Sequence, residues 1–348
     1  MASNNRERDA AQNQHYVPKF ILRNFLSNET KEQVSVFRKS SRKGFQTSIR
    51  NIMAERRFHE FSIDAEFIAS FEESVGRIED MVLPTYRKVV TERRLEGTAE
   101  ERTNLALLIA FQFVRTRQQR DMFVQAEQQL KRHLEKYAGS IEQIEGYEPL
   151  TPDMLTRQHV EFIRGAIPEF LPHIVCKDLL LLEATEGRSF YLADNPVCLY
   201  NSAPADPMFG NIGLAIEGIE IYLPLSSDLM LAAWCPSRLR EMQHHRDTAF
   251  DEVRRQLLAQ VRLGKIRPDM MRIQLQVMEE MGRPAEALLR NVENGTPAAM
   301  TAENMDFTNS LQMTYARDYV ICKQGDFRLA RKFMDDFPCH RGQGISTT

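Results

Sequence analysis

Residues 178–200 read DLLLLEATEGRSFYLADNPVCLY, and this stretch decides the expected fold class. Two apolar runs, 178–185 and 189–193, flank a turn centred on Gly187, which predicts a β-hairpin. Further strand-like runs lie at 196–200, 219–223, 228–234 and 318–322. Because strands and helices do not alternate at short spacing, the sequence predicts an α+β protein with a mainly antiparallel sheet.

A second β-rich stretch lies near the N-terminus. Val34 and Val36 alternate with polar residues, and a polar turn at 39–44 leads into Phe45–Ile52, which predicts another hairpin. The segment Arg57–Phe61 is expected to add an edge strand. We expect this N-terminal hairpin to share its sheet with the central and C-terminal strands.

The remaining segments carry helical patterns in the middle and C-terminal regions. Thr98 and Glu101 form a capping box before the run 106–114, which is apolar on nearly all sides and predicts a core helix. Pro84 is expected to kink or end the helix before it, and the helix from 151 is expected to end near Gly165 or before Pro168. Helices packed on the sheet are predicted at 15–25, 68–82, 98–134, 151–165, 247–261, 269–281, 284–292 and 302–315.

Composition bounds the class of protein. The chain has 348 residues, 43% of them hydrophobic, and 45 basic against 48 acidic side chains, so the formal net charge is −3. This is typical of a soluble globular protein and excludes one that wraps nucleic acid through overall positive charge. We expect one domain over 14–337, between a disordered tail at 1–13 and a flexible tail at 338–348.

Cysteine spacing and apolar runs exclude further classes. The five cysteines form no C-x-x-C pair, which argues against a zinc knuckle. The first residues contain no apolar signal core, and no apolar run approaches the about 20 residues that span a bilayer. A cytoplasmic protein without a membrane partner is therefore expected. The standard dinucleotide, P-loop, zincin and hydrolase motifs do not occur.

Three polar clusters are the candidates for chemistry. His15 precedes Lys19 and Arg23, which lie four apart on one face of the expected helix. A histidine beside two cations stays neutral more readily and suits a site for phosphate or carboxylate. Alternatively, His15 caps the helix and the cations are solvated.

The second cluster is Asp194-Asn195-Pro196, directly after a strand-like run. A carboxylate and an amide at a strand end can hold a metal ion, act as a base or bind a ligand. The alternative is an Asx turn, in which the Asp194 carboxylate accepts from backbone amides.

The third cluster is Arg115-Thr116-Arg117, immediately after the most apolar helix. A guanidinium at that depth needs a partner, because an unpaired buried charge is costly. The partner is either a carboxylate such as Asp194 or a bound anion.

The N-terminal hairpin is basic and carries interleaved aromatic residues. Such a surface can track a nucleic-acid backbone and stack on bases, but a solvated hairpin tip has the same composition. The nucleic-acid candidates are Arg38, Lys39, Arg42 and Lys43.

The motifs resemble one family. The opening Gln14-His15-Tyr16-Val17-Pro18 and the following Leu22-Arg23-Asn24-Phe25 closely resemble the start of a widespread bacterial family called domain of unknown function 4238. Other similar landmarks follow in the same order up to Cys322: Arg115-Thr116, Asp194–Val197, Leu223–Ser226, Asn309 and 318–322. Ala193 stands where the family more typically has serine, which argues against a serine mechanism. The resemblance implies family membership and supplies no activity.

Two functions are open at this stage. In the first, the protein is a hydrolase acting on phosphodiesters, nuclease-like, with a divalent cation. His15 and Asp194 would be catalytic, Asp194 would hold the metal, and the substrate would be bound by Lys19, Arg23, Asn24, Arg115, Asn195 and Asn309. In the second, it is a non-catalytic module that binds nucleic acid, a nucleotide or a partner protein. The first function requires His15, Arg115 and Asp194 to meet around one cleft.

Overall fold

The structure is a computed structural model and describes residues 13–56, 58–62, 68–137, 147–205, 210–340 and 342. The expected N-terminal tail lies outside these ranges except for Asn13, which begins a strand. Most of the expected C-terminal tail, 341 and 343–348, also lies outside them.

The fold is α+β, and its larger sheet is formed by the central strands. Its order is β12-β7-β11-β10-β9, and all pairs are antiparallel except β12 with β7. Leu180–Leu182 of β7 and the whole inner run of β11 are buried in the main core. The strands are β7 (Asp178–Glu183), β9 (Cys198–Tyr200), β10 (Glu220–Pro224), β11 (Leu229–Trp234) and β12 (Ala298–Ala299).

A second sheet joins the two ends of the chain. Its order is β3-β2-β13-β8, and Val36 of β2 pairs with Ile321 of β13. The N-terminal hairpin is therefore confirmed as a hairpin, but it pairs with the C-terminal strand and lies in a different sheet from most central strands. The strands are β2 (Gln33–Arg38), β3 (Lys43–Ser48), β8 (Leu192–Ala193) and β13 (Tyr319–Ile321).

The hairpin predicted at 178–193 does not form. The turn at Gly187 is present, but β7 pairs with β11 over six residues whereas β8 pairs with β13 in the other sheet. A turn sets only the local direction of the chain; the partner of each strand is decided by which distant strand covers its apolar face.

Two short strand pairs complete the β structure. β1 (Asn13–His15) pairs with β4 (Ala54–Arg56), and β5 (Glu60–Ser62) pairs with β6 (Ile68–Ser70). The predicted helix start at 68 is therefore wrong, because 68–70 form a strand. The opening motif continues into α2 (Lys19–Leu22) and the 3-10 turn η1 (Arg23–Phe25).

Four helices form the middle of the body. α4 lies between α3 and α6, and its residues from Leu105 to Val114 are nearly all buried, as expected for a core helix. Its N-cap is Thr98, whose hydroxyl accepts from the Glu101 amide. The predicted continuous helix ends at Val114, and α5 starts after Thr116. The helices are α3 (Glu72–Glu92), α4 (Ala99–Val114), α5 (Arg117–Tyr137) and α6 (Pro152–Val175).

Prolines inside helices did not end them. Pro84 lies within α3, and Pro168 and Pro172 lie within α6. All three are exposed, so the carbonyl that loses its amide partner can bind water. The buried faces of α3 and α6 hold the helices in one piece.

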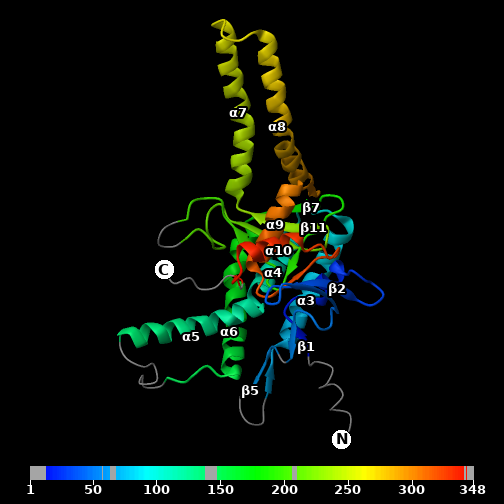
Figure 1. The fold of residues 1–348 in the computed structure, drawn as a ribbon, viewed down its shortest axis with the longest axis vertical. Helices are drawn as coiled ribbons and strands as arrows, with labels where there is room; N and C mark the ends of the chain where they lie inside the picture. The colour runs from blue at the N-terminus through cyan, green and yellow to red at the C-terminus, as the bar shows by residue number, and fades with distance from the viewer. Residues whose placement is uncertain are drawn as a thin grey trace.

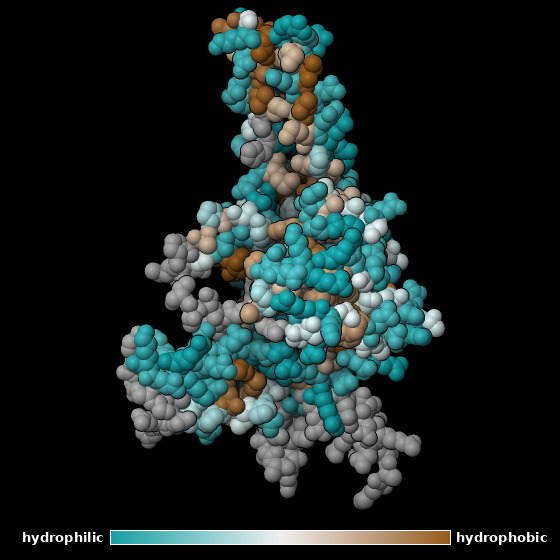
Figure 2. Space-filling model, viewed as in Figure 1, coloured by the Kyte–Doolittle hydropathy of each residue, from teal (hydrophilic) through white to brown (hydrophobic). Residues whose placement is uncertain are grey.

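Two long helices project from the body as an arm (Figure 1). α7 (Pro236–Arg262) begins eleven residues before the predicted start at 247, and α8 (Pro268–Asn294) replaces two predicted short helices. α9 (Ala302–Tyr315) follows as predicted, whereas α10 (Arg328–Asp336) was not predicted. Apolar residues gather on the outer part of the arm (Figure 2).

Candidate functional site

The opening motif lies at a cleft between β1, α2 and α3. The cleft has a volume of about 370 Å³. Four of the residues predicted as site residues reach it. It is lined by Asn13, His15, Lys19, Phe20, Arg23, Glu72, Glu79, Leu83, Arg87 and Arg115.

Arg115 forms the buried side of this cleft. Its side chain is 1% exposed, Nη1 pairs with Glu79 Oε1 at 2.6 Å, and Nη2 donates to the His15 carbonyl at 2.6 Å. The guanidinium also lies over the Phe111 ring, 4.5 Å from its centroid. Nε is buried and has no acceptor among the described residues. The predicted partner of Arg115 is thus a carboxylate, but it is Glu79 and not Asp194.

His15 is held as a neutral ring. Its Nε2 lies 2.8 Å from the Ile49 carbonyl, and since a carbonyl can only accept, Nε2 carries the proton and Nδ1 keeps its lone pair. Burial lowers the pKa of His15, and the charges of Lys19 and Arg115 lower it further. A neutral imidazole with one free lone pair can serve as a base or as a hydrogen-bond acceptor.

The charge of the cleft is positive. Four cationic side chains line it against two carboxylates, and Glu79 is already paired with Arg115. Arg23 makes one long contact of 3.4 Å to Glu32. Among the described residues, no carboxylate lies within ion-pair distance of Lys19 or Arg87 at its mouth. The cleft therefore attracts an anion.

Asp194 does not line this cleft. Its carboxylate is buried and accepts three backbone amides, from Arg317 at 2.7 Å, Asp318 at 2.9 Å and Tyr319 at 3.0 Å. Burial raises the pKa of Asp194 to about 6, against the opposing effect of these amides. Both oxygens are occupied by the peptide backbone, so the expected meeting with His15 in one cleft is not observed.

The prediction of a metal ligand at Asp194 concerns a carboxylate that is already bound by three backbone amides. Among the described residues, no group of three or more His, Cys, Asp or Glu side chains is arranged to hold a metal ion. The catalytic and metal roles given to Asp194 thus have no geometric support here, and the amide-capping alternative describes its contacts.

Thr116 connects the two halves of the predicted site. Its hydroxyl donates to Asn195 Oδ1 at 3.0 Å, one residue after Arg115 reaches the opening motif. Asn195 is buried and also borders a separate apolar pocket of about 590 Å³. The Arg115-Thr116 pair therefore joins the His15 and Asp194 segments without opening a common cavity.

Two further predicted substrate residues bind backbone instead. Asn24 Nδ2 donates to the Tyr86 hydroxyl at 2.6 Å, and that hydroxyl donates to the Leu225 carbonyl at 2.5 Å. Asn309 Oδ1 accepts from the Tyr191 amide at 2.7 Å, and its Nδ2 donates to the Ser189 carbonyl at 3.1 Å. Backbone groups occupy both polar atoms of the Asn309 amide, and Tyr86 occupies Nδ2 of Asn24.

The basic hairpin requires one correction. Lys39 is 1% exposed, and its Nζ donates to the carbonyls of Met313 and Ala316 at 2.8 and 2.7 Å, so it cannot contact nucleic acid. Arg38 pairs with Asp318 at 2.9 Å. The remaining candidates, Arg42 and Lys43, are exposed at the hairpin turn.

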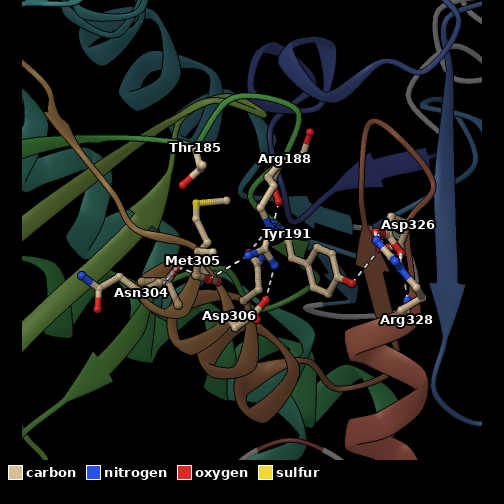
Figure 3. Close-up of polar contacts among 12 residues, drawn as sticks. Thr185, Arg188, Tyr191, Asn304, Met305, Asp306, Asp326 and Arg328 are labelled. Carbon is tan, nitrogen blue, oxygen red and sulfur yellow. Dashed lines mark hydrogen bonds and ion pairs between the residues drawn. The ribbon is translucent and has the colours of Figure 1, made fainter.

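A second polar cleft lies beside Asn309, and four of its five charged side chains form two ion pairs. Arg188 donates to the Ala302 carbonyl at 2.8 Å and pairs with Asp306, and Arg328 pairs with Asp326 (Figure 3). The Tyr191 hydroxyl donates to the Asp326 carbonyl at 2.7 Å (Figure 3). The two carboxylates of the cleft are therefore occupied by arginines, and the network ties β8 to α9 and α10, with Lys332 as the fifth charged side chain.

Three charged residues of the His15 cleft were missed from the sequence. Glu72, Glu79 and Arg87 all lie on α3, together with Leu83. Their spacing of 7, 4 and 4 residues places them on one helix face. The signal was present, but nothing local shows that this face meets the opening motif 60 residues earlier.

The geometry defines an α+β protein with a small cationic cleft beside its opening motif. The profile of the family described as "Protein of unknown function (DUF4238)" matches residues 13–326, nearly the whole chain. The chain belongs to this family. No curated protein and no solved structure matches the chain. No helix in the described ranges is both long and apolar enough to cross a membrane.

Proposed function

We propose that the His15 cleft binds the phosphate group of a small ligand. The observation that carries the proposal is the pair of exposed cations, Lys19 and Arg87, at the mouth of a cleft whose buried side is Arg115. Glu79 is already paired with Arg115, so its carboxylate does not balance the charge of the other cations. A ligand phosphate would supply the missing negative charge.

The size of the cleft favours a small ligand. A volume of about 370 Å³ is at the lower end of typical ligand sites and suits a phosphate with a small attached group, such as a mononucleotide. Neutral His15 would accept a hydrogen bond at Nδ1 from a ligand hydroxyl or a protonated phosphate oxygen. This corresponds to the binding-module function and requires no metal.

Calorimetric titration with inorganic phosphate and with a mononucleotide tests the proposal. Arg87→Gln should weaken binding by about tenfold, because one charge-assisted hydrogen bond is lost. Arg77→Gln is the matched control, since Arg77 lies on the same helix, is exposed and does not line the cleft. Binding should also weaken as salt is added.

Two results would contradict phosphate binding at this cleft. One is an equal affinity of the Arg87→Gln and Arg77→Gln proteins. The other is the absence of any change in the Arg115 Nε resonance when phosphate is added to the wild-type protein. Acetate binding as strongly as phosphate would show a general anion site instead.

Hydrolysis of a phosphodiester is the second candidate, and the state of His15 favours it. A neutral imidazole whose Nε2 is fixed by the Ile49 carbonyl can take a proton from water at Nδ1. The water oxygen would then attack phosphorus, the bond to the leaving oxygen would break, and the cations would stabilise the negative charge.

A chromogenic phosphodiester distinguishes hydrolysis from binding. His15→Gln keeps an N–H for the Ile49 carbonyl but removes the base, so turnover should fall by about 100-fold or more while phosphate affinity changes little. Asp194→Asn should lower stability without this effect on the rate per folded molecule. Wild-type protein that binds phosphate and turns over nothing, with or without Mg²⁺, leaves binding as the function.

A further inference from the structure

The arm formed by α7 and α8 carries an apolar stripe that the rest of the chain does not cover. Met270, Ile273, Val277 and Met281 of α8 are 43%, 53%, 49% and 77% exposed. Their spacing of 3, 4 and 4 residues places them on one face of the helix. Six of the thirteen large hydrophobic residues exposed in the described ranges lie between 258 and 281. The outer arm is therefore the main exposed apolar surface (Figure 2).

This stripe is separate from the seam that holds the two helices together. α7 packs on α8 through half-buried or buried residues such as Leu257, Leu275 and Met278. At 100° per residue, the stripe lies roughly a quarter to a third of a turn from that seam. The stripe is not needed to hold α7 against α8. A contiguous exposed apolar surface of this kind is typical of a contact with another molecule.

We infer that the stripe is the contact between two copies of this chain, whose arms pack antiparallel about a two-fold axis at Val277. Ile273 of one copy would lie against Met281 of the second copy, and the reverse contact would follow by symmetry. The interface would be a helix pair added to each hairpin, giving a four-helix arrangement.

Charge supports the antiparallel direction. The outer arm, residues 253–278, carries six basic side chains against one acidic, a net charge of +5. The inner parts, 236–252 and 279–294, carry eight acidic against five basic, a net charge of −3. Antiparallel packing places each basic tip beside an acidic base, whereas parallel packing would place two basic tips together.

The length of the arm also supports a two-fold axis at Val277. Val277 lies 13 residues from Gly264 at the tip and 12 residues from Leu289, where α8 becomes buried against the body. At 1.5 Å per residue, the distances from Val277 to the tip and from Val277 to the body are each about 18–20 Å. A tip that packs beyond Val277 of the second copy therefore ends at its body without colliding with it.

An anionic membrane is the competing partner for a basic, apolar arm. The inner end of the stripe at Met281 is flanked by Glu279 and Glu280, which an anionic surface would repel and the basic tip of a second copy would attract. The charge along the stripe therefore favours a second copy.

Light scattering on the full chain tests the inference. The wild-type protein should have twice the 40.3 kDa chain mass, and Val277→Glu should weaken self-association by more than about 100-fold, because two like charges would meet at the axis. Met81→Glu is the matched control, because Met81 is 57% exposed, against 49% for Val277, but lies on α3. It should remain dimeric.

Cysteine cross-linking tests the register, with the exposed Cys176 and Cys339 replaced by serine. Val277→Cys should cross-link to itself, and Ile273→Cys should cross-link to the Met281→Cys protein but not to itself. A monomeric wild type, a dimer unaffected by Val277→Glu, or self-linked Ile273→Cys would overturn the inference. A monomer that sediments with phosphatidylserine vesicles would establish the membrane partner instead.

Discussion

At the scale of single residues, the family landmarks act mainly on the backbone. Arg115 binds the His15 carbonyl, Thr116 binds Asn195, and Asp194 accepts three amides. Each polar side chain satisfies groups from a distant segment, and loss of such a contact inside the fold is costly. Arg23 of the opening motif is the exception, because its side chain is 54% exposed and makes only a 3.4 Å contact to Glu32.

A buried histidine makes the protein sensitive to acid. His159 Nε2 donates to the Val114 carbonyl at 2.9 Å and its Nδ1 accepts from Arg120, so both nitrogens require the neutral ring. Burial, with the charge of Arg120, lowers the pKa of His159 to about 3 from its ordinary 6.5. Below pH 6.5 the unfolded chain binds a proton that the folded chain excludes, so stability falls as pH falls.

Between pH 7 and pH 5, His159 alone should lower the free energy of unfolding by about 2 kcal/mol. His159→Gln can keep both hydrogen bonds but cannot titrate, so its free energy of unfolding should fall less over this range. Urea denaturation at the two pH values measures the difference. Equal pH dependence of the two proteins would show that His159 titrates normally in the fold.

At the scale of elements, the arm is attached to the body through the end of α8. Gly295 ends the helix with φ of +66°, and its carbonyl accepts from the Leu95 amide at 2.8 Å. A side-chain carbon at this position would lie 2.1 Å from the Leu95 carbonyl oxygen. The close approach joins α8 to the segment before α4.

Two glycines with the same φ allow backbone strain to be distinguished from a steric clash. Gly264, at the arm's tip, also has φ of +66° but nothing lies within 4 Å of an added carbon. Gly264→Ala should therefore cost about 1 kcal/mol of left-handed strain, and Gly295→Ala at least about 2 kcal/mol more. Thermal and denaturant unfolding measure both, and equal costs would contradict the close contact.

At the scale of the whole molecule, Lys39 joins the N-terminal hairpin to the end of α9 and to His340. Its Nζ donates to two carbonyls at the end of α9 and lies 3.1 Å from His340 Nδ1. Burial, together with the charge of Lys39, lowers the pKa of His340 to about 4. The β2–β13 pairing lies directly beside it. The chain as far as His340 is therefore packed against the folded body.

Replacing Lys39 by methionine would leave two buried carbonyls without a donor. We expect Lys39→Met to lower the free energy of unfolding by about 2–4 kcal/mol and to speed proteolysis near His340. Lys43→Met, on the exposed part of the same hairpin, should change stability by less than about 0.5 kcal/mol. Similar stabilities for the two variants would show that the buried contacts of Lys39 contribute little.

Much of the His15 cleft could be predicted from the sequence, and part could not. His15, Lys19 and Arg23 are neighbours on the chain, so their spacing alone placed them together. Arg115 was identified because a charge after an apolar helix needs a partner, but its partner was misassigned. Asp194 was assigned to the same site because a carboxylate at a strand end fits either a ligand site or a turn that caps backbone amides. Its contacts with backbone amides in the structure distinguish the two.

The sequence by itself determined the features that depend on residues within a few positions of each other. These are the Thr98 cap, the N-terminal hairpin, the helix at 302–315 and the α+β class. The tertiary structure decided which strands pair, which helix face meets the opening motif, and that helices continue through their prolines. The physical reason is that these outcomes depend on contacts between segments far apart in the chain, such as Arg115 with His15, whose free energy is absent from any local pattern.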